Sequence, residues 1–237
     1  MQRVFLGTLV LAIALFSMAG CGSKPDSEPQ SAKVPGDGPA AEKADGGNAT
    51  DPGKAAAAKS SDAAQQALLH PEVVIETSAG NIKVRLNMEK ARMTSENFLR
   101  NYVERGFYQG TVFHHVESGF MIIGGGYTAE GLVKETRTPI HNESYNGLKN
   151  RRGTIAMARD AAYADSATSQ FFINLADNPS LDYAEQDGKP QFGYCVFGEV
   201  VEGMDVVDRI AQTPVKASGN FPKMPAEPVT IRAVVRR

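Results

Sequence analysis

The 237-residue chain has little cysteine, no tryptophan and almost no net charge. Its two cysteines, Cys21 and Cys195, are too few for a disulfide framework. The net charge of −2 lacks the basic excess typical of nucleic-acid-binding proteins, so no nucleic-acid partner is expected. The apolar run near the N-terminus is shorter than the roughly 20 residues of a membrane-spanning helix. Hydrophobic residues still make up 42% of the chain, which is enough for a sizeable core.

The N-terminus has the pattern of a secretory signal, in which Arg3 precedes an apolar run over residues 4–16. The segment Met18–Cys21 resembles a bacterial lipobox, whose cysteine becomes the new N-terminus and carries lipid. We therefore predict a signal peptide at residues 1–20 and lipidation at Cys21. The alternatives are a buried N-terminal helix and ordinary cleavage. The expected location is the cell envelope, with the protein anchored to a membrane by lipid and facing the periplasm or exterior.

Residues 22–70 contain no aromatic side chain and are rich in Ala, Gly, Pro, Ser, Asp and Lys. Such a segment buries too little apolar area to offset the entropy of ordering it. Residues 21–70 are therefore predicted to be the lipid-attachment cysteine and a disordered linker, with a reach on the order of 40 Å. A linker of this length would let a folded domain work away from the membrane surface.

The pattern of a folded domain begins at residue 71 and extends to residue 237. One helix is predicted with Thr94 or Ser95 as N-cap and with its end before Gly106, and a second over residues 204–211. Short strands separated by turn residues favour a closed antiparallel barrel or a sandwich, and the pattern does not choose between them. The predicted strands are residues 73–77, 82–86, 111–116, 120–123, 153–158, 170–175, 193–200 and 229–235.

Three motifs point to one family when they are taken together. They are FHHVESGFMIIGGG at residues 113–126, GTIAMAR at 153–159 followed by SQFFI at 169–173, and FGYCVFG at 192–198. In this order they resemble the cyclophilins, in particular the bacterial branch, over about residues 72–235. The resemblance implies a mostly β fold, an eight-stranded closed antiparallel barrel capped by two helices, here preceded by the signal peptide and the disordered stalk. It also implies a peptidyl-prolyl cis–trans isomerase that assists the folding of exported proteins.

An isomerase of this kind stabilises a twisted amide and uses no cofactor or metal. The expected partners are proline-containing polypeptides, and the chain is expected to be a monomer. Phe120 and Phe172 on strands, taken alone, would be interpreted as core residues, and only their family positions indicate a site. By family position, the proline pocket falls on Phe120, Met121, Phe172 and Leu181, the peptide-backbone contacts on Ala158, Arg159 and Gln170, and the closing ring on Tyr194. Gln170 is also expected to be catalytic, because its amide offers a donor and an acceptor.

Three positions depart from the family pattern. His115 stands where cyclophilins carry the main catalytic Arg, Ile123 replaces a Gln, and Ser180 replaces an aromatic residue. If His115 is the catalytic donor, activity should be weak and should rise as the pH falls toward about 6.5, the ordinary pKa of histidine. The alternative is a non-catalytic, tethered binder of Xaa-Pro segments. A weaker third reading is an envelope lipoprotein that keeps only the fold.

Three other side chains were considered for roles at the site. His114 is expected to be structural, and alternation along a strand would point it away from His115, so the pair is not expected to bind a metal. The Arg159 side chain is interpreted as a solvated surface arginine, with a reach across the peptide groove as the alternative. Cys195 is predicted to be a buried, inert thiol.

Overall fold

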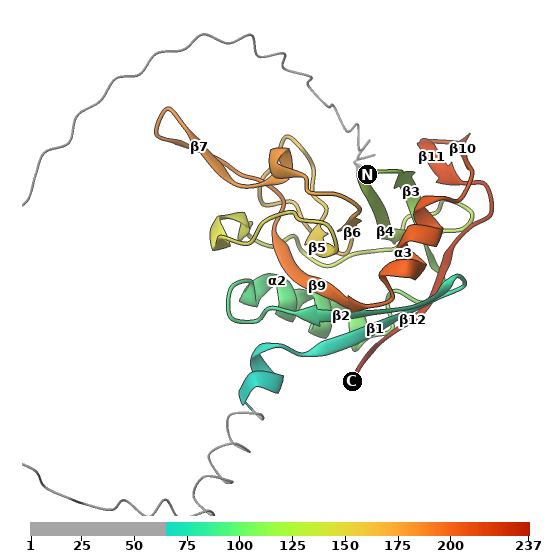
Figure 1. The fold of residues 1–237 in the computed structure, drawn as a ribbon, viewed down its shortest axis with the longest axis horizontal. Helices are drawn as coiled ribbons and strands as arrows, with labels where there is room; N and C mark the ends of the chain where they lie inside the picture. The colour runs from blue at the N-terminus through green and yellow to red at the C-terminus, as the bar shows by residue number, and fades with distance from the viewer. Residues whose placement is uncertain (1–64) are drawn as a thin grey trace, which may run out of the picture.

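Eight antiparallel strands close into a barrel in the computed structural model, which describes residues 65–237 (Figure 1). Around the barrel the strand order is β1, β12, β3, β4, β6, β5, β9 and β2. The predicted barrel is thus confirmed, while the signal peptide, Cys21 and most of the linker lie outside the described residues. The strands are β1 (Glu72–Thr77), β2 (Gly80–Leu86), β3 (Thr111–Glu117), β4 (Met121–Thr128), β5 (Thr154–Met157), β6 (Phe171–Asn174), β9 (Val196–Glu202) and β12 (Thr230–Arg236).

Alternating side chains explain why these segments form strands. Ile82, Val84 and Leu86 of β2 are all buried, whereas the residues between them are more exposed. The predicted hairpin between β1 and β2 is present, with Thr77 paired to Gly80. The Thr77 hydroxyl fixes this turn, because it donates to the Gly80 carbonyl and accepts from the Ala79 amide.

The two helical segments cap the barrel as expected. The first is α2 (Arg92–Glu96), which continues as the π-helix η1 (Asn97–Val103), and the second is α3 (Met204–Ala211). Phe98 of η1 and Val207 of α3 are fully buried in the barrel core. No helix among residues 65–237 is both long and apolar enough to cross a membrane.

The predicted N-cap of the first helix is wrong. Thr94 and Ser95 are buried inside α2, which begins at Arg92 without a side-chain cap from its own N-cap residue. Instead the Glu143 carboxylate accepts hydrogen bonds from the amides of Met93 and Thr94, at 3.2 and 2.8 Å. An acidic group suits the positive end of a helix. Because Glu143 is about fifty residues away along the chain, no local pattern could have indicated it.

Two short hairpins lie outside the barrel and were not predicted. The first joins β7 (Ala184–Gln186) to β8 (Lys189–Gln191) and extends away from the barrel (Figure 1). The second joins β10 (Val215–Ser218) to β11 (Phe221–Pro225), and β11 packs along β3. All residues of β7, β8 and β10 are exposed, so these strands carry no apolar alternation to detect.

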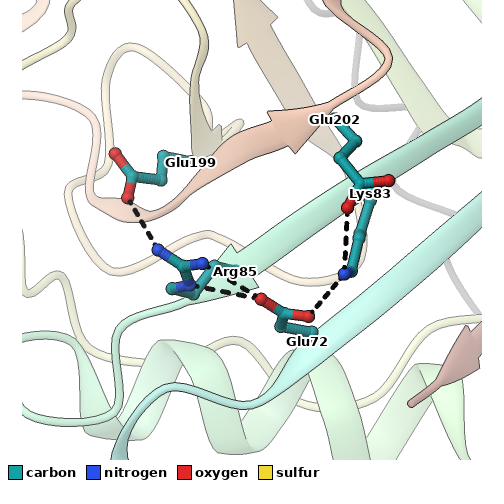
Figure 2. A network of polar contacts seen from close by, with 5 residues as sticks. All are labelled: Glu72, Lys83, Arg85, Glu199 and Glu202. Carbon is teal, nitrogen blue, oxygen red and sulfur yellow. Dashed lines mark hydrogen bonds and ion pairs between the residues drawn. The ribbon is translucent and has the colours of Figure 1, made fainter.

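Figure 2 shows an ion-pair network across three neighbouring barrel strands. Glu72 of β1 contacts Lys83 and Arg85 of β2, with a Glu72–Lys83 distance of 2.8 Å. Lys83 also pairs with Glu202, and Arg85 with Glu199, both on β9. Lys83 is the main cause of the lowered pKa of Glu72. Because the groups are solvated and screened, the network adds little to stability and serves chiefly to link the strands.

Candidate active site

A second apolar cluster lies on the outer face of the barrel, separate from the interior core. Consecutive residues of β6 alternate between the two, since Phe171 and Ile173 belong to the core and Phe172 to the second cluster. We call this second set the outer cluster. Its buried members are Met121, Ile123, Ala156, Ala158, Phe172 and Val196, with Phe120, Leu148, Leu181 and Tyr194 packed against them and partly exposed.

One row of paired residues places His115 on the same face as the outer cluster. His115 of β3 pairs with Ile123 of β4, Ile123 with Phe172 of β6, and Phe172 with Ala156 of β5. Strands are about 4.8 Å apart, so His115 lies roughly 10 Å from Phe172, measured between backbones. The structure therefore brings His115 close to the predicted pocket side chains.

The predicted pocket residues meet in the outer cluster. Phe172 is its centre, and the Tyr194 ring meets it edge-on, with 5.6 Å between ring centroids. Met121 and Phe172 are almost fully buried, whereas Phe120, Leu181 and Tyr194 keep surface open to solvent. Apolar side chains that are part buried and part open form a surface on which a proline ring can pack.

Gln170 lies immediately before β6, and its side chain packs against the backbone of Gly126 on β4. A methyl group at Gly126 would lie 2.5 Å from Cγ of Gln170, so only glycine permits this placement. Oε1 of Gln170 is buried and has no hydrogen-bond partner among the described residues. The carbonyl of Gln170 accepts from the Ala158 amide at 2.9 Å. A peptide can therefore reach Ala158 through its carbonyl or methyl group but not through its amide.

A buried asparagine network supports the pocket, and the sequence reasoning missed it. Asn178 donates to the Phe120 carbonyl at 2.9 Å and to Asn174 at 2.7 Å. Asn174 in turn donates to Asn150, which donates to the Leu181 carbonyl at 3.1 Å. The backbones of two pocket residues are thus held by one chain of side-chain amides. The only sequence signal was the presence of asparagines within and beside apolar strands, where a buried amide needs partners.

Arg159 ties together two loops beside the pocket. Its guanidinium donates to the carbonyls of Phe192 and Gly193 at 2.5 and 3.0 Å, and to that of Asp160 at 2.8 Å. The same group lies over the Tyr194 ring, 4.8 Å from the ring centroid, at cation–π distance. The interpretation as a solvated surface arginine is wrong, because backbone carbonyls of two loops hold the guanidinium in place. A reach across the peptide groove stays a prediction.

His115 is part buried and has one charged neighbour on its own strand. Its Nε2 atom lies 3.6 Å from Oε2 of Glu117, and the Lys223 ammonium of β11 lies 2.5 Å from the other oxygen of that carboxylate. Burial lowers the pKa of His115 below its ordinary value of 6.5, and Lys223 acts in the same direction, while Glu117 opposes them. The imidazole is therefore neutral near pH 7. Any rise in activity from its protonation would begin at a lower pH than the sequence indicated.

The expected alternation between His114 and His115 is wrong. The register of β3 against β4 shifts between Phe113 and His115, and Phe113 and Val116 are both in the barrel core. A β-bulge therefore leaves two successive histidines outside the core.

The two imidazoles nevertheless have different neighbours. His114 is buried between the rings of Tyr127 and Phe221, with centroid distances of 4.7 and 5.4 Å. Burial lowers the pKa of His114 to about 3. Within residues 65–237, no group of three or more His, Cys, Asp or Glu side chains is placed to hold a metal ion.

Comparison with known proteins agrees with this geometry. The family model for cyclophilin-type peptidyl-prolyl cis–trans isomerases matches residues 72–236. The chain belongs to the cyclophilin family. Peptidyl-prolyl cis–trans isomerase A of Dickeya dadantii is 48% identical over 161 residues, which are 68% of this chain and 82% of that protein. Peptidyl-prolyl cis–trans isomerase B of Escherichia coli is 48% identical over 162 residues, 68% of this chain and 97% of that protein.

Solved cyclophilin structures share the fold. A crystal structure of a Cryptosporidium parvum cyclophilin has a TM-score of 0.58 and 26% identity, and the match covers 71% of this chain and 98% of that one. A second structure of the same protein, determined with the dipeptide Ala-Pro, has a TM-score of 0.57, with 26% identity over 70% of this chain and 98% of that one. Because the cyclophilin region covers almost the whole E. coli relative, residues 65–237 are expected to fold by themselves.

As a cyclophilin, the protein is a peptidyl-prolyl cis–trans isomerase. An Xaa-Pro bond rotates slowly because partial double-bond character imposes a barrier of about 18–20 kcal/mol. An enzyme lowers this barrier by binding the twisted amide more tightly than the planar one. The outer cluster presents an apolar surface, and the buried side-chain oxygen of Gln170 has no hydrogen-bond partner among the described residues.

The remaining departures from the cyclophilin pattern change the edge of the pocket. Ile123 is buried in the outer cluster and offers only apolar surface where the family has an amide. Ser180 is exposed and adds no ring to the pocket. Cys195 is buried, and burial raises the pKa of its thiol to about 12, as expected for an unreactive cysteine.

Proposed function

We propose that this cyclophilin isomerises Xaa-Pro bonds in exported proteins, with His115 as a weak donor in place of the family arginine. The observation that carries the proposal is a buried polar atom without a partner beside an apolar surface that His115 also faces. Oε1 of Gln170 has no hydrogen-bond partner in the described part of the chain, and the strand register places His115 on the same face of the barrel as Phe172. Folded proteins rarely leave such an atom unpaired, and a bound peptide would supply a partner. The substrate is a proline-containing polypeptide.

In the proposed mechanism, the proline ring packs on Phe172 and Met121 while Gln170 holds the peptide backbone. Twisting the bond returns a lone pair to the proline nitrogen, and a donor aimed at that nitrogen stabilises the twisted state. Neutral imidazole has one N–H and protonated imidazole has two, so protonation of His115 increases its value as a donor. The reach of His115 is shorter than that of an arginine, which reduces the effect.

The experiment is to measure isomerisation of a short Ala-Pro peptide by residues 65–237 and by the His115→Arg variant. Restoring one preorganised donor should raise kcat/KM by about 10²-fold. The matched control is His141→Arg, which adds the same charge at an exposed histidine that pairs only with Asp165. Activity in the wild-type domain that rises below pH 6.5 supports the proposal, whereas a flat profile between about pH 5 and 8 contradicts the donor role of His115.

The second candidate function is a non-catalytic binder of Xaa-Pro segments. Three substitutions at the pocket edge favour it. His115 stands in place of the family Arg, Ile123 in place of a Gln, and Ser180 in place of an aromatic residue. If only His115→Arg is active, and the wild-type domain binds the peptide without turnover, this candidate is correct. If neither form binds or turns over the peptide, the site has lost both functions.

We also propose that the domain acts in the cell envelope, anchored by lipid on Cys21. The support is the apolar run at residues 4–16 and the lipobox-like segment Met18–Cys21. The test is metabolic labelling with a fatty-acid analogue in a bacterial host. The wild-type chain and Cys195→Ser should both be labelled and sediment with membranes, whereas Cys21→Ser should do neither. Equal labelling of Cys21→Ser would reject lipidation at this residue.

A further inference from the structure

One carboxylate connects His115 to a lysine from a hairpin outside the barrel. Glu117 lies two residues after His115 on β3, and its Oε2 atom is 3.6 Å from Nε2 of His115. Its other oxygen, Oε1, is 2.5 Å from Nζ of Lys223 on β11. The side chains become more open along this series, with 14% of His115, 24% of Glu117 and 42% of Lys223 exposed.

The surroundings of His115 contain few charges that could act on it. Its own strand contributes Glu117 and the buried, neutral His114. The neighbouring strand β4 places Ile123 opposite it, and the titratable residue of β4, Tyr127, packs on His114. The hairpin contributes Lys223, which interacts with His115 through space. Within the described residues, Glu117 and Lys223 are therefore the charges that act on His115, in addition to the effect of its burial.

We propose that Glu117 and Lys223 are positioning residues of the isomerase, which set the tautomer and the charge of His115. The proposal rests on the proposed role of His115 as the donor. With Glu117 beside Nε2, a neutral His115 keeps its proton on that nitrogen, and Nδ1 is then only an acceptor. Nδ1 becomes a donor when the ring is protonated, while Nε2 stays directed at Glu117. Lys223 opposes protonation, because it neutralises the carboxylate that would stabilise the imidazolium.

In this proposal the hairpin β10–β11 acts on catalysis through Lys223, in addition to packing along β3. Phe221 covers His114, and Lys223 reaches Glu117, so both ends of the bulged segment of β3 are contacted by β11. Movement of Lys223 away from Glu117 would make His115 easier to protonate. The reverse change, loss of the Glu117 charge, would make it harder, because Lys223 would remain without its counter-charge.

The test is an NMR titration of the imidazole signals in residues 65–237, with two variants that should act in opposite directions. Lys223→Met should raise the pKa of His115, and Glu117→Gln should lower it. The matched controls are Lys216→Met on the same hairpin and the exposed Glu227→Gln, which should leave it unchanged. His115→Gln identifies the signal. Lys223→Gln is a second neutral variant in case Lys223→Met does not fold.

The pH profile of isomerisation, measured on the same samples, separates this inference from the proposed function. If the rise in kcat at acid pH shifts to higher pH in Lys223→Met and to lower pH in Glu117→Gln, both the proposed function and this inference are supported. If the titrations shift but the profile does not follow, His115 is not the donor, and its neighbours are not positioning residues. If the profile depends on His115 but neither variant moves its titration, the proposed function stands and this inference is wrong. Loss of activity at every pH in Lys223→Met, with the titration unchanged, would also overturn it.

Discussion

Gln170 depends on a residue of the neighbouring strand that has no side chain. Its Cγ fills the space beside Gly126, and Oε1 is left buried without a partner. The motif predicted that Gln170 would belong to the site, but not why a glycine faces it. The reason appears only when β4 and β6 are paired, because the two residues are more than forty positions apart in the sequence.

Gly126→Ala should lower kcat/KM for an Ala-Pro peptide by about 10-fold or more, because the added methyl group displaces the Gln170 side chain. A double-mutant cycle identifies the cause. If Gly126 acts through Gln170, then Gly126→Ala should have little further effect in a Gln170→Ala background. Additive losses would show that Gly126 affects catalysis by another route.

The surroundings of His115 and His114 could not be predicted from the sequence. The substitution of Arg by His was visible in the sequence and predicted weak, pH-dependent catalysis. The bulge in β3 and the contacts of His115 with Glu117 and Lys223 were not visible, because they depend on register and on a hairpin about a hundred residues away. Burial of the imidazole, assisted by Lys223 and opposed by Glu117, moves the expected pH dependence below the ordinary pKa of histidine.

At the scale of elements, buried strands and α3 were predicted well, and exposed elements were not. Residues 204–211 were expected to be helical and are α3, since apolar side chains recur on one face of that segment. Strand β4 is longer than expected, because its three glycines continue the pairing without apolar alternation. The hairpins β7–β8 and β10–β11 have mostly exposed side chains, so the periodic signal on which strand prediction depends is missing.

The loops beside the pocket are connected through Arg159, and this gives a prediction at the same scale. Arg159→Ala removes hydrogen bonds to the carbonyls of Phe192 and Gly193 and releases the Tyr194 ring. KM for a proline peptide should rise several-fold. The free energy of unfolding should fall by about 1 kcal/mol, because hydrogen bonds are lost while the Gly193 carbonyl keeps its Asn142 donor and the Phe192 carbonyl is open to water.

Arg159→Lys is the informative companion to that variant. It keeps the charge but not the fork geometry, so it should restore only part of the affinity. Arg151→Ala, at an exposed arginine nearby in the sequence, is the control in kinetic and urea-unfolding measurements. An unchanged KM for Arg159→Ala would show that Tyr194 does not need this contact.

At the scale of the whole molecule, His114 links folding stability to pH. The imidazole is buried between Tyr127 and Phe221, and its pKa is about 3 in the folded protein against an ordinary value of 6.5. Below about pH 6.5 the unfolded chain binds a proton at this residue and the folded chain does not. Stability should therefore fall as the pH is lowered from 6.5 toward 3, by about 1.4 kcal/mol for each pH unit well below 6.5.

Replacing His114 with Phe should remove the part of this dependence that belongs to His114, whereas His115, whose pKa is also lowered, keeps its own part. Urea unfolding at pH 7 and pH 5 should show a smaller loss of stability in His114→Phe than in the wild-type domain, whatever the absolute stability of the variant. His141→Phe, at an exposed histidine, should keep the wild-type slope. Carboxylates with lowered pKa values, such as Glu72 and Glu117, lose their contribution only at lower pH and do not interfere in this window. Equal slopes for the wild-type domain and His114→Phe would contradict the buried, neutral state of His114.

The sequence by itself indicated the buried strands through their alternation, and its motifs indicated the family and with it the barrel, because alternation and close-set motifs are local properties of the chain. The tertiary structure decided how the pocket side chains are held. Glu143 at the start of α2, the asparagine network under Phe120 and Leu181, the Arg159 contacts and the Glu117–Lys223 pair all join segments that are distant in the sequence. Polar contacts of this kind need particular atoms within about 3 Å, and only the closed fold sets those distances.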